Sequence, residues 1–198
     1  MNRMNIRIWL TASQRRALGI FCYMVLLIAG CAAGTICRMT DAFAPLCQFC
    51  IRYGIPCLSN MDGSLFLASM RWNGCILLMS FCLGFCAIGQ PFLCTLLVLH
   101  GFGLGCLLTG LTDAASVRTL LFPYTLAAIY GMAVSFLLLL GVRESMRLSC
   151  VYLKICTQSA DAQEMCRRLR MYAVRFVVLL LLILSVSGLY ALFYGVLF

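Results

Sequence analysis

The run from Asn73 to Leu111 constrains the fold most, because it includes one histidine but no aspartate, glutamate, lysine or arginine. A transmembrane helix needs about 20 apolar residues to cross a hydrocarbon core of roughly 30 Å, and each helical residue advances about 1.5 Å. A single straight helix over the whole run would be almost twice as long as the bilayer core is thick. The run therefore predicts two membrane-spanning helices joined by a turn.

The sequence GQPF, residues 89–92, lies near the middle of this run. Proline lacks an amide hydrogen and disfavours helix in the residue before it. Gln90 and Pro91 are therefore predicted to form the turn of a tight helical hairpin directly after Gly89. The side-chain amide of Gln90 is expected to cap carbonyl groups that the break leaves free. The alternative is one long helix that is kinked at Pro91.

The composition extends this prediction to the whole chain. Of its 198 residues 64% are hydrophobic and 11% are charged, and the mean hydropathy is +1.02. A soluble domain of this size would need far more polar surface to cover its core. The sequence predicts an all-α, polytopic integral membrane protein that forms a single domain over residues 1–198. Five transmembrane helices are expected, at about residues 17–37, 74–89, 92–111, 123–142 and 173–193.

The distribution of the basic residues predicts the orientation, because short loops rich in Lys and Arg stay cytoplasmic. Eleven of the 15 lie in the amino-terminal tail or around the segment between the fourth and fifth spans: Arg3, Arg7, Arg15, Arg16, Arg143, Arg147, Lys154, Arg167, Arg168, Arg170 and Arg175. With five spans, both regions fall on one side of the membrane. The amino terminus is therefore expected in the cytoplasm and Phe198 outside. Anionic membrane lipids account for the net charge of +9 without a nucleic-acid partner.

The segment after the fourth span is expected to continue as a helix through Lys154 and to break within TQSADAQ, residues 157–163. Asp161, with Glu164 three positions later, is typical of the start of a further helix. The external loop, residues 38–72, is expected to lie against the membrane. Neither segment has the length of an enzyme domain.

Two pairs of glycines have the spacing of close helix contacts in membranes. Gly30 and Gly34 lie in the first span, and Gly101 and Gly105 lie in the third. Small residues four positions apart allow two helices to approach closely, so tight helix packing is the favoured interpretation. The competing interpretation of the first span is a lipoprotein signal with Cys31 as the lipidated residue. Four further spans would make such an anchor redundant.

The 14 cysteines do not form one pattern. Eight lie within or at the edges of the predicted spans, where a thiol acts as a small hydrophobic group. Cys47, Cys50 and Cys57 lie in the external loop and have a spacing that fits a disulfide or part of a metal site. These three cysteines are the only potential metal ligands in this pattern, and no histidine is near them in the sequence. We therefore expect no metal and no cofactor.

His100 is the one histidine of the chain and lies within the third predicted span, beside Gly101. Ionisable groups inside a membrane often carry function, but no mid-span carboxylate is available to pair with it. A hydrogen bond to another helix is favoured over a role in an ion relay. The sequence contains no nucleophile elbow, zinc signature or phosphate-binding loop, so no enzymatic activity is expected.

Two stretches of this sequence resemble the stage II sporulation protein M family. They are GFCAIGQPFLCTLLVLHGFGLGCLLTGL, residues 84–111, and LLFPYTLAAIYGMAVSF, residues 120–136. The matching positions of the central hairpin and of the fourth span are Gly89, Pro91, Gly101, Gly105 and Pro123. The sequence departs from the family where His100 stands in place of a lysine or arginine, where Tyr124 and Thr125 form the polar pair, and where Tyr130 replaces a proline.

The resemblance implies a non-enzymatic scaffold in a peptidoglycan-remodelling complex that acts in forespore engulfment. Its implied partners are the cell-wall hydrolases stage II sporulation proteins D and P, in the septal and mother-cell membrane. We expect lipid-facing small residues to dock the partners' single transmembrane anchors. The alternatives are a permease-like subunit of a transporter and a thiol-based redox protein that uses Cys47 and Cys50.

Overall fold

The computed structural model describes residues 12–40, 45–47, 64–86, 88–114, 118–157 and 162–197, and these are almost wholly helical, without a strand. The long helices are α1 (Ala12–Met39), α3 (Ser64–Gly84), α4 (Gly89–Ala114), α5 (Arg118–Thr157) and α6 (Ala162–Leu197). Residues 45–47 form a short helical turn. The prediction of an all-α fold is therefore confirmed.

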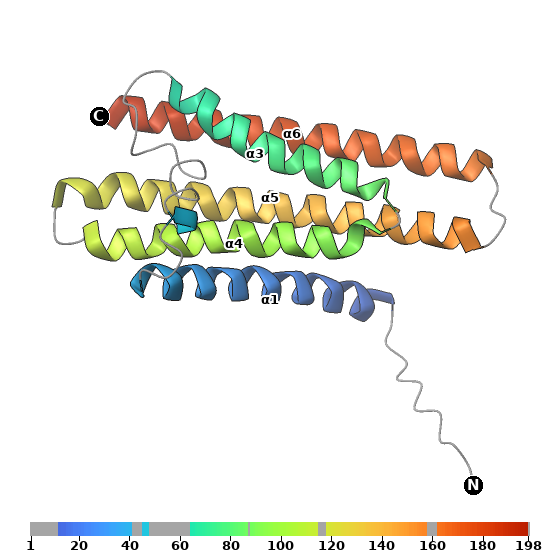
Figure 1. Cartoon of the computed structure of the whole chain (residues 1–198). Coiled ribbons are helices and arrows are strands. Elements are labelled where there is room, and N and C mark those ends of the chain that lie inside the picture. The colour runs from blue at the N-terminus through green and yellow to red at the C-terminus, as the bar shows by residue number, and fades with distance from the viewer. Residues whose placement is uncertain are drawn as a thin grey trace, which may run out of the picture.

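The helices lie side by side in layers, with α1 on one face, α4 and α5 in the middle and α3 with α6 on the other face (Figure 1). Consecutive helices run in opposite directions, so that α1 begins at one end of the bundle and α6 ends at the other (Figure 1). Helix α5 contacts each of the other four. The centre of the fold is thus a helix whose buried residues face several neighbours at once.

Four segments of the described helices are long and apolar enough to cross a membrane: Gly19–Met39, Gly89–Thr109, Thr125–Leu153 and Cys166–Gly195. The chain therefore has the architecture of a multi-pass membrane protein. These segments correspond to the predicted spans near residues 17–37, 92–111, 123–142 and 173–193. Helix α3, which contains most of the predicted span at 74–89, is not among them.

Helices α5 and α6 are longer than a bilayer requires. Helix α5 runs without a break from Arg118 to Thr157. At about 1.5 Å per residue it extends roughly 60 Å, about twice the hydrocarbon thickness. The predicted continuation of the fourth helix through Lys154 is therefore confirmed. Helix α6 begins at Ala162, close to the predicted restart, and Asp161 itself lies outside the described residues.

The turn between α3 and α4 differs from the predicted hairpin. Helix α3 ends at Gly84 and α4 begins at Gly89, so one long helix kinked at Pro91 is wrong. The Phe85 amide donates to the Cys82 carbonyl at 3.1 Å, and the Gly89 amide donates to the Cys86 carbonyl at 3.0 Å. Pro91 lies in the first turn of α4. A missing amide hydrogen costs no helical bond there.

Two further features of the hairpin need correction. Gln90 does not cap the carbonyls of the break, because its side-chain amide donates to the Cys150 sulfur in α5 at 3.3 Å. The two helices also do not form a closely packed pair. Helix α3 packs mainly on α5 and α6, whereas α4 packs mainly on α1 and α5. The divergence of α3 from α4 leaves space between them.

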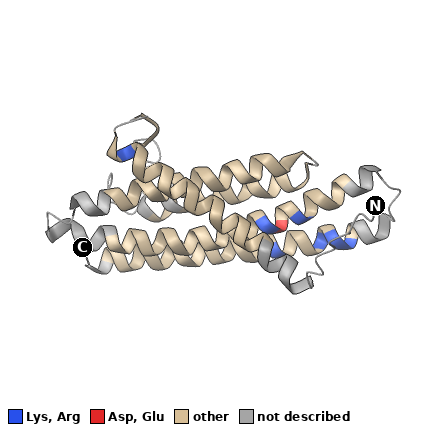
Figure 2. Cartoon of the chain, turned by 90° about the horizontal axis from the view of Figure 1, so that it is seen from below, with Lys and Arg blue, Asp and Glu red and all other residues tan. Residues whose placement is uncertain are grey.

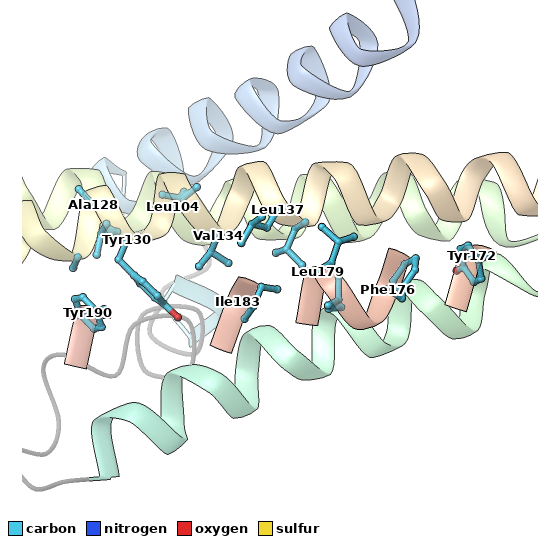
Figure 3. Packing of buried hydrophobic residues seen from close by; sticks show 14 of the residues in the cluster. Leu104, Ala128, Tyr130, Val134, Leu137, Tyr172, Phe176, Leu179, Ile183 and Tyr190 are labelled. Carbon is cyan, nitrogen blue, oxygen red and sulfur yellow. The ribbon is translucent and has the colours of Figure 1, made fainter. Parts of the chain in front are cut away.

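The main hydrophobic core runs along α5 and α6 and is completed by α3 and α4 (Figure 3). Aromatic rings mark its two ends. Tyr130 and Tyr190 stack with ring centroids 4.4 Å apart at one end, and Phe81 and Tyr172 stack at 5.1 Å at the other. Moving apolar side chains from lipid into a protein core gains little free energy, because both surroundings are apolar. Close packing and hydrogen bonds between helices therefore hold a bundle together in a membrane.

Candidate functional site

The four glycines singled out in the sequence meet in one contact between α1 and α4. A Cβ atom would overlap the carbonyl oxygen of Val98 at Gly30, of Phe102 at Gly34, of Leu27 at Gly101 and of Cys31 at Gly105. Each helix thus presents two glycines to the backbone of the other. Only the absence of a side chain allows this approach, which also suits weak bonds from Cα hydrogens to carbonyl oxygens.

The end of this contact is closed by polar groups. The guanidinium of Arg38, in the last turn of α1, donates to the carbonyl of Cys106 in α4 at 2.7 Å. The Cys106 thiol in turn donates to the carbonyl of Gly34 at 3.6 Å. The buried Cys47 packs beside Cys106 and Phe102, whereas Cys50 and Cys57 lie outside the described residues. The chain itself fills this seam, so another protein's helix cannot occupy it.

A second polar link joins α3, α5 and α6. The side-chain amide of Asn73 donates to the hydroxyl of Tyr130 at 2.8 Å, and that hydroxyl shares a hydrogen bond of 3.0 Å with Ser187. All three side chains are buried. The link provides hydrogen-bond partners for the hydroxyl of Tyr130 inside an apolar core. Sequence reasoning missed it, although single polar residues within apolar stretches were the available signal.

A third link lies at the opposite end of the same core. Tyr172 of α6 donates to the carbonyl of Phe81 in α3 at 3.0 Å and lies 3.0 Å from the hydroxyl of Ser145 in α5. Gly84 permits this arrangement, because a Cβ there would overlap the Tyr172 hydroxyl. The two tyrosine links therefore tie the same three helices near both ends of their contact.

His100 makes the predicted type of contact, a hydrogen bond to another helix. Its Nε2 lies 2.9 Å from the Oγ of Ser135 in α5. Ser135 Oγ donates to the carbonyl of Gly131 at 2.7 Å. The hydroxyl of Ser135 has one hydrogen, so Nε2 of His100 must be the donor for both bonds to form.

Beside His100 lies a cavity of about 450 Å³ between α3, α4 and α5. Its wall is mostly aliphatic and aromatic, and its side chains with polar atoms are those of Trp72, Asn73, Thr95, His100 and Tyr130. No aspartate, glutamate, lysine or arginine is among the described residues that line it. Volume and lining are those of a site for a small apolar molecule. Sequence reasoning did not find it, because it arises from the divergence of α3 from α4.

Charged residues gather at one end of the bundle, where the second half of α5 meets the first half of α6 (Figure 2). Glu144 of α5 pairs with Arg147 at 2.9 Å and with Arg175 of α6. A cavity of about 510 Å³ opens here, lined by Glu144 and by the four arginines Arg147, Arg167, Arg168 and Arg175, with an apolar wall that includes Met171 and Tyr172. The excess of arginine fits an anionic group beside an apolar surface.

The remaining predicted residues have local roles. Gly89 begins α4, and a Cβ there would overlap the carbonyl oxygen of Leu83. The carbonyl of Pro91 accepts a hydrogen bond from Thr95 at 3.0 Å. Pro123 lies five residues after the start of α5 at Arg118. The structure brings Gly30, Gly34, Gly101 and Gly105 together, but it does not join them to Gly89, Gln90 or Pro91 in one site.

Comparisons with models of protein families, with curated proteins and with solved structures found no match to this chain.

Proposed function

We propose that this chain is a non-enzymatic, five-span membrane scaffold that holds membrane-anchored cell-wall hydrolases together during peptidoglycan remodelling. The proposal joins the resemblance to the stage II sporulation protein M family with one structural observation. In the described part of the chain, every enclosed side-chain nitrogen or oxygen has a hydrogen-bond partner. Several of these bonds join different helices, such as Asn73 to Tyr130 and Tyr172 to the Phe81 carbonyl, which supports a rigid structural component.

The fifth span of this proposal is α3. It lies along α5 and α6, which both contain segments that could cross a membrane (Figure 1). The alternating directions of the five helices then give an odd number of crossings. The amino terminus lies in the cytoplasm with the arginine-rich end of α5 and α6, and the carboxyl terminus lies outside.

Partner anchors dock outside the glycine seam, because α1 and α4 fill that seam themselves. The outward side chains of α6 offer an apolar surface instead, including Val177, Leu181 and Leu189, each more than half exposed. Gly101 and Gly105 then affect partner binding indirectly, because they allow α4 to pack closely against α1. Anionic lipid headgroups bind at the arginine-lined cavity and hold the charged end at the cytoplasmic surface.

The apolar cavity beside His100 is the observation that favours a permease-like subunit as the second candidate. Transport of an ion or a charged substrate would require charged or coordinating groups along the path. Among the described residues, the cavity wall offers His100 but no Asp, Glu, Lys or Arg. The scaffold therefore remains the better-supported function.

Purification of the tagged chain after co-expression with stage II sporulation proteins D and P tests the scaffold. Both hydrolases are expected to remain with the chain through solubilisation, and removal of their transmembrane anchors is expected to abolish recovery. Recovery that persists without the anchors would contradict docking within the membrane. Failure of either hydrolase to co-purify with a folded chain would contradict the proposed partners.

A further inference from the structure

The cavity between α3, α4 and α5 is elongated along the helices. On α3 its lining extends from Trp72 to Leu83, and on α4 from Phe92 to Leu107. The α3 side alone corresponds to roughly 17 Å at about 1.5 Å per residue. This length is a little over half of a hydrocarbon core of roughly 30 Å, which is the reach of one membrane leaflet. The dimensions therefore suit a single hydrocarbon chain.

His100 lies at the middle of the α4 side of this cavity. Its Nε2 donates to Ser135, which itself donates to Gly131. The neutral ring therefore keeps no hydrogen on Nδ1, which is then an acceptor. Within the described residues His100 makes no other hydrogen bond. Every enclosed side-chain nitrogen of the described part has a partner, so Nδ1 is not enclosed, and its residue lines the cavity.

Two other polar side chains on the wall already donate to the protein. The Asn73 amide donates to Tyr130 at 2.8 Å, and the Thr95 hydroxyl donates to the Pro91 carbonyl at 3.0 Å. Because Nδ1 of His100 is an acceptor, an occupant that forms a hydrogen bond with it must bring a donor of its own. An ionised carboxylate or a phosphodiester has no hydrogen to donate, and an ammonium group would be buried without a negative partner. A neutral hydroxyl group meets both conditions.

We propose that this cavity binds a long-chain lipid alcohol, with the hydrocarbon chain along α3 and α4 and the hydroxyl donating to Nδ1 of His100. A lipid could enter the cavity from the bilayer, because the cavity lies beside segments that could cross a membrane, Gly89–Thr109 and Thr125–Leu153. This site is independent of the scaffold role, so either proposal can fail without the other.

The single histidine of the sequence makes the test direct. The full chain, labelled with ¹⁵N-histidine and placed in phospholipid nanodiscs, gives ring-nitrogen signals from His100 alone. Without ligand the spectrum is expected to show hydrogen on Nε2 and none on Nδ1. Dodecanol is expected to shift the Nδ1 signal in a saturable manner, whereas dodecane, which lacks the hydroxyl, leaves it in place. A hydrogen on Nδ1 in the free protein, or equal responses to both compounds, would overturn the proposal.

Two substitutions test the contributions of the cavity and of the hydrogen bond separately. Leu99→Trp adds bulk at the wall of the cavity and is expected to abolish the dodecanol shift, whereas Leu182→Trp on the outer face of α6 leaves it unchanged. His100→Leu removes the acceptor and is expected to weaken dodecanol binding, measured by calorimetry, about five- to tenfold, as for one neutral hydrogen bond. Unchanged dodecanol affinity in a folded His100→Leu protein would contradict the assigned role of Nδ1.

Discussion

Gly105 of α4 lies so close to Cys31 of α1 that a single methyl group on the glycine would overlap the carbonyl oxygen of the cysteine. The same relationship holds in the reverse direction, because Gly30 of α1 faces the backbone of Val98 in α4. Helix α1 has few other contacts, and these are mainly with α5. The attachment of the first span to the bundle therefore depends on this seam.

Gly105→Ala is expected to destabilise the protein by about 1–3 kcal/mol, because the added methyl group forces two helix backbones apart. The loss is measured as a lowered midpoint of thermal unfolding in detergent. Gly74→Ala is the matched control, since a Cβ at Gly74 would meet nothing within 4 Å. Equal stability of the two variants would show that α1 and α4 do not approach through these glycines.

Tyr130→Phe is expected to cost about 1 kcal/mol of unfolding free energy. The reason is that Asn73 and Ser187 lose their shared partner. Asn73→Leu removes the donor from α3. Residues in one hydrogen-bond network are coupled, so the double variant is expected to lose less stability than the sum of the two single losses. Strict additivity in denaturant unfolding would contradict the link.

Glu144→Gln is expected to lower stability by less than about 1 kcal/mol, because water screens exposed ion pairs. Both arginine partners of Glu144 are about half exposed. Added salt is expected to narrow the difference between the wild-type protein and the variant. A difference in unfolding free energy that persists at about 1 M salt would indicate that Glu144 acts through packing instead of charge.

Anionic phospholipid is expected to stabilise the protein through the arginine-lined cavity. Thermal unfolding in vesicles that contain phosphatidylglycerol should occur at a higher temperature than in phosphatidylcholine alone. Replacing Arg167 and Arg168 together by glutamine should remove most of this difference, whereas Arg71→Gln, outside the cavity lining, should preserve it. Free phosphate in place of the lipid should have little effect. Loss of the lipid effect in Arg71→Gln would place the site elsewhere.

Composition and hydropathy were sufficient to predict the helices and the four segments that could cross a membrane, because lipid restricts a buried backbone to few structures. The turn was misplaced because Pro91 also suits the first turn of a helix. The break lies between Gly84 and Gly89. The sequence does not distinguish these two glycines from the glycines that pack helices together.

The candidate site was predicted only in parts. The spacing of Gly30 with Gly34 and of Gly101 with Gly105 predicted close helix contacts, but spacing within one helix does not identify the helix it faces. His100 was correctly expected to bond to another helix. The cavity beside it depends on where α3 diverges from α4, a tertiary feature with no local pattern in the sequence.

The central claim is that five helices cross the membrane in alternating directions, with the arginine-rich end in the cytoplasm. Epitope tags at the two ends of the chain, exposed to a protease added outside intact cells whose outer surface is accessible, test it most directly. The account predicts that the carboxyl-terminal tag is removed while the amino-terminal tag is protected. Protection of both tags, or removal of both, would mean an even number of crossings and would contradict it.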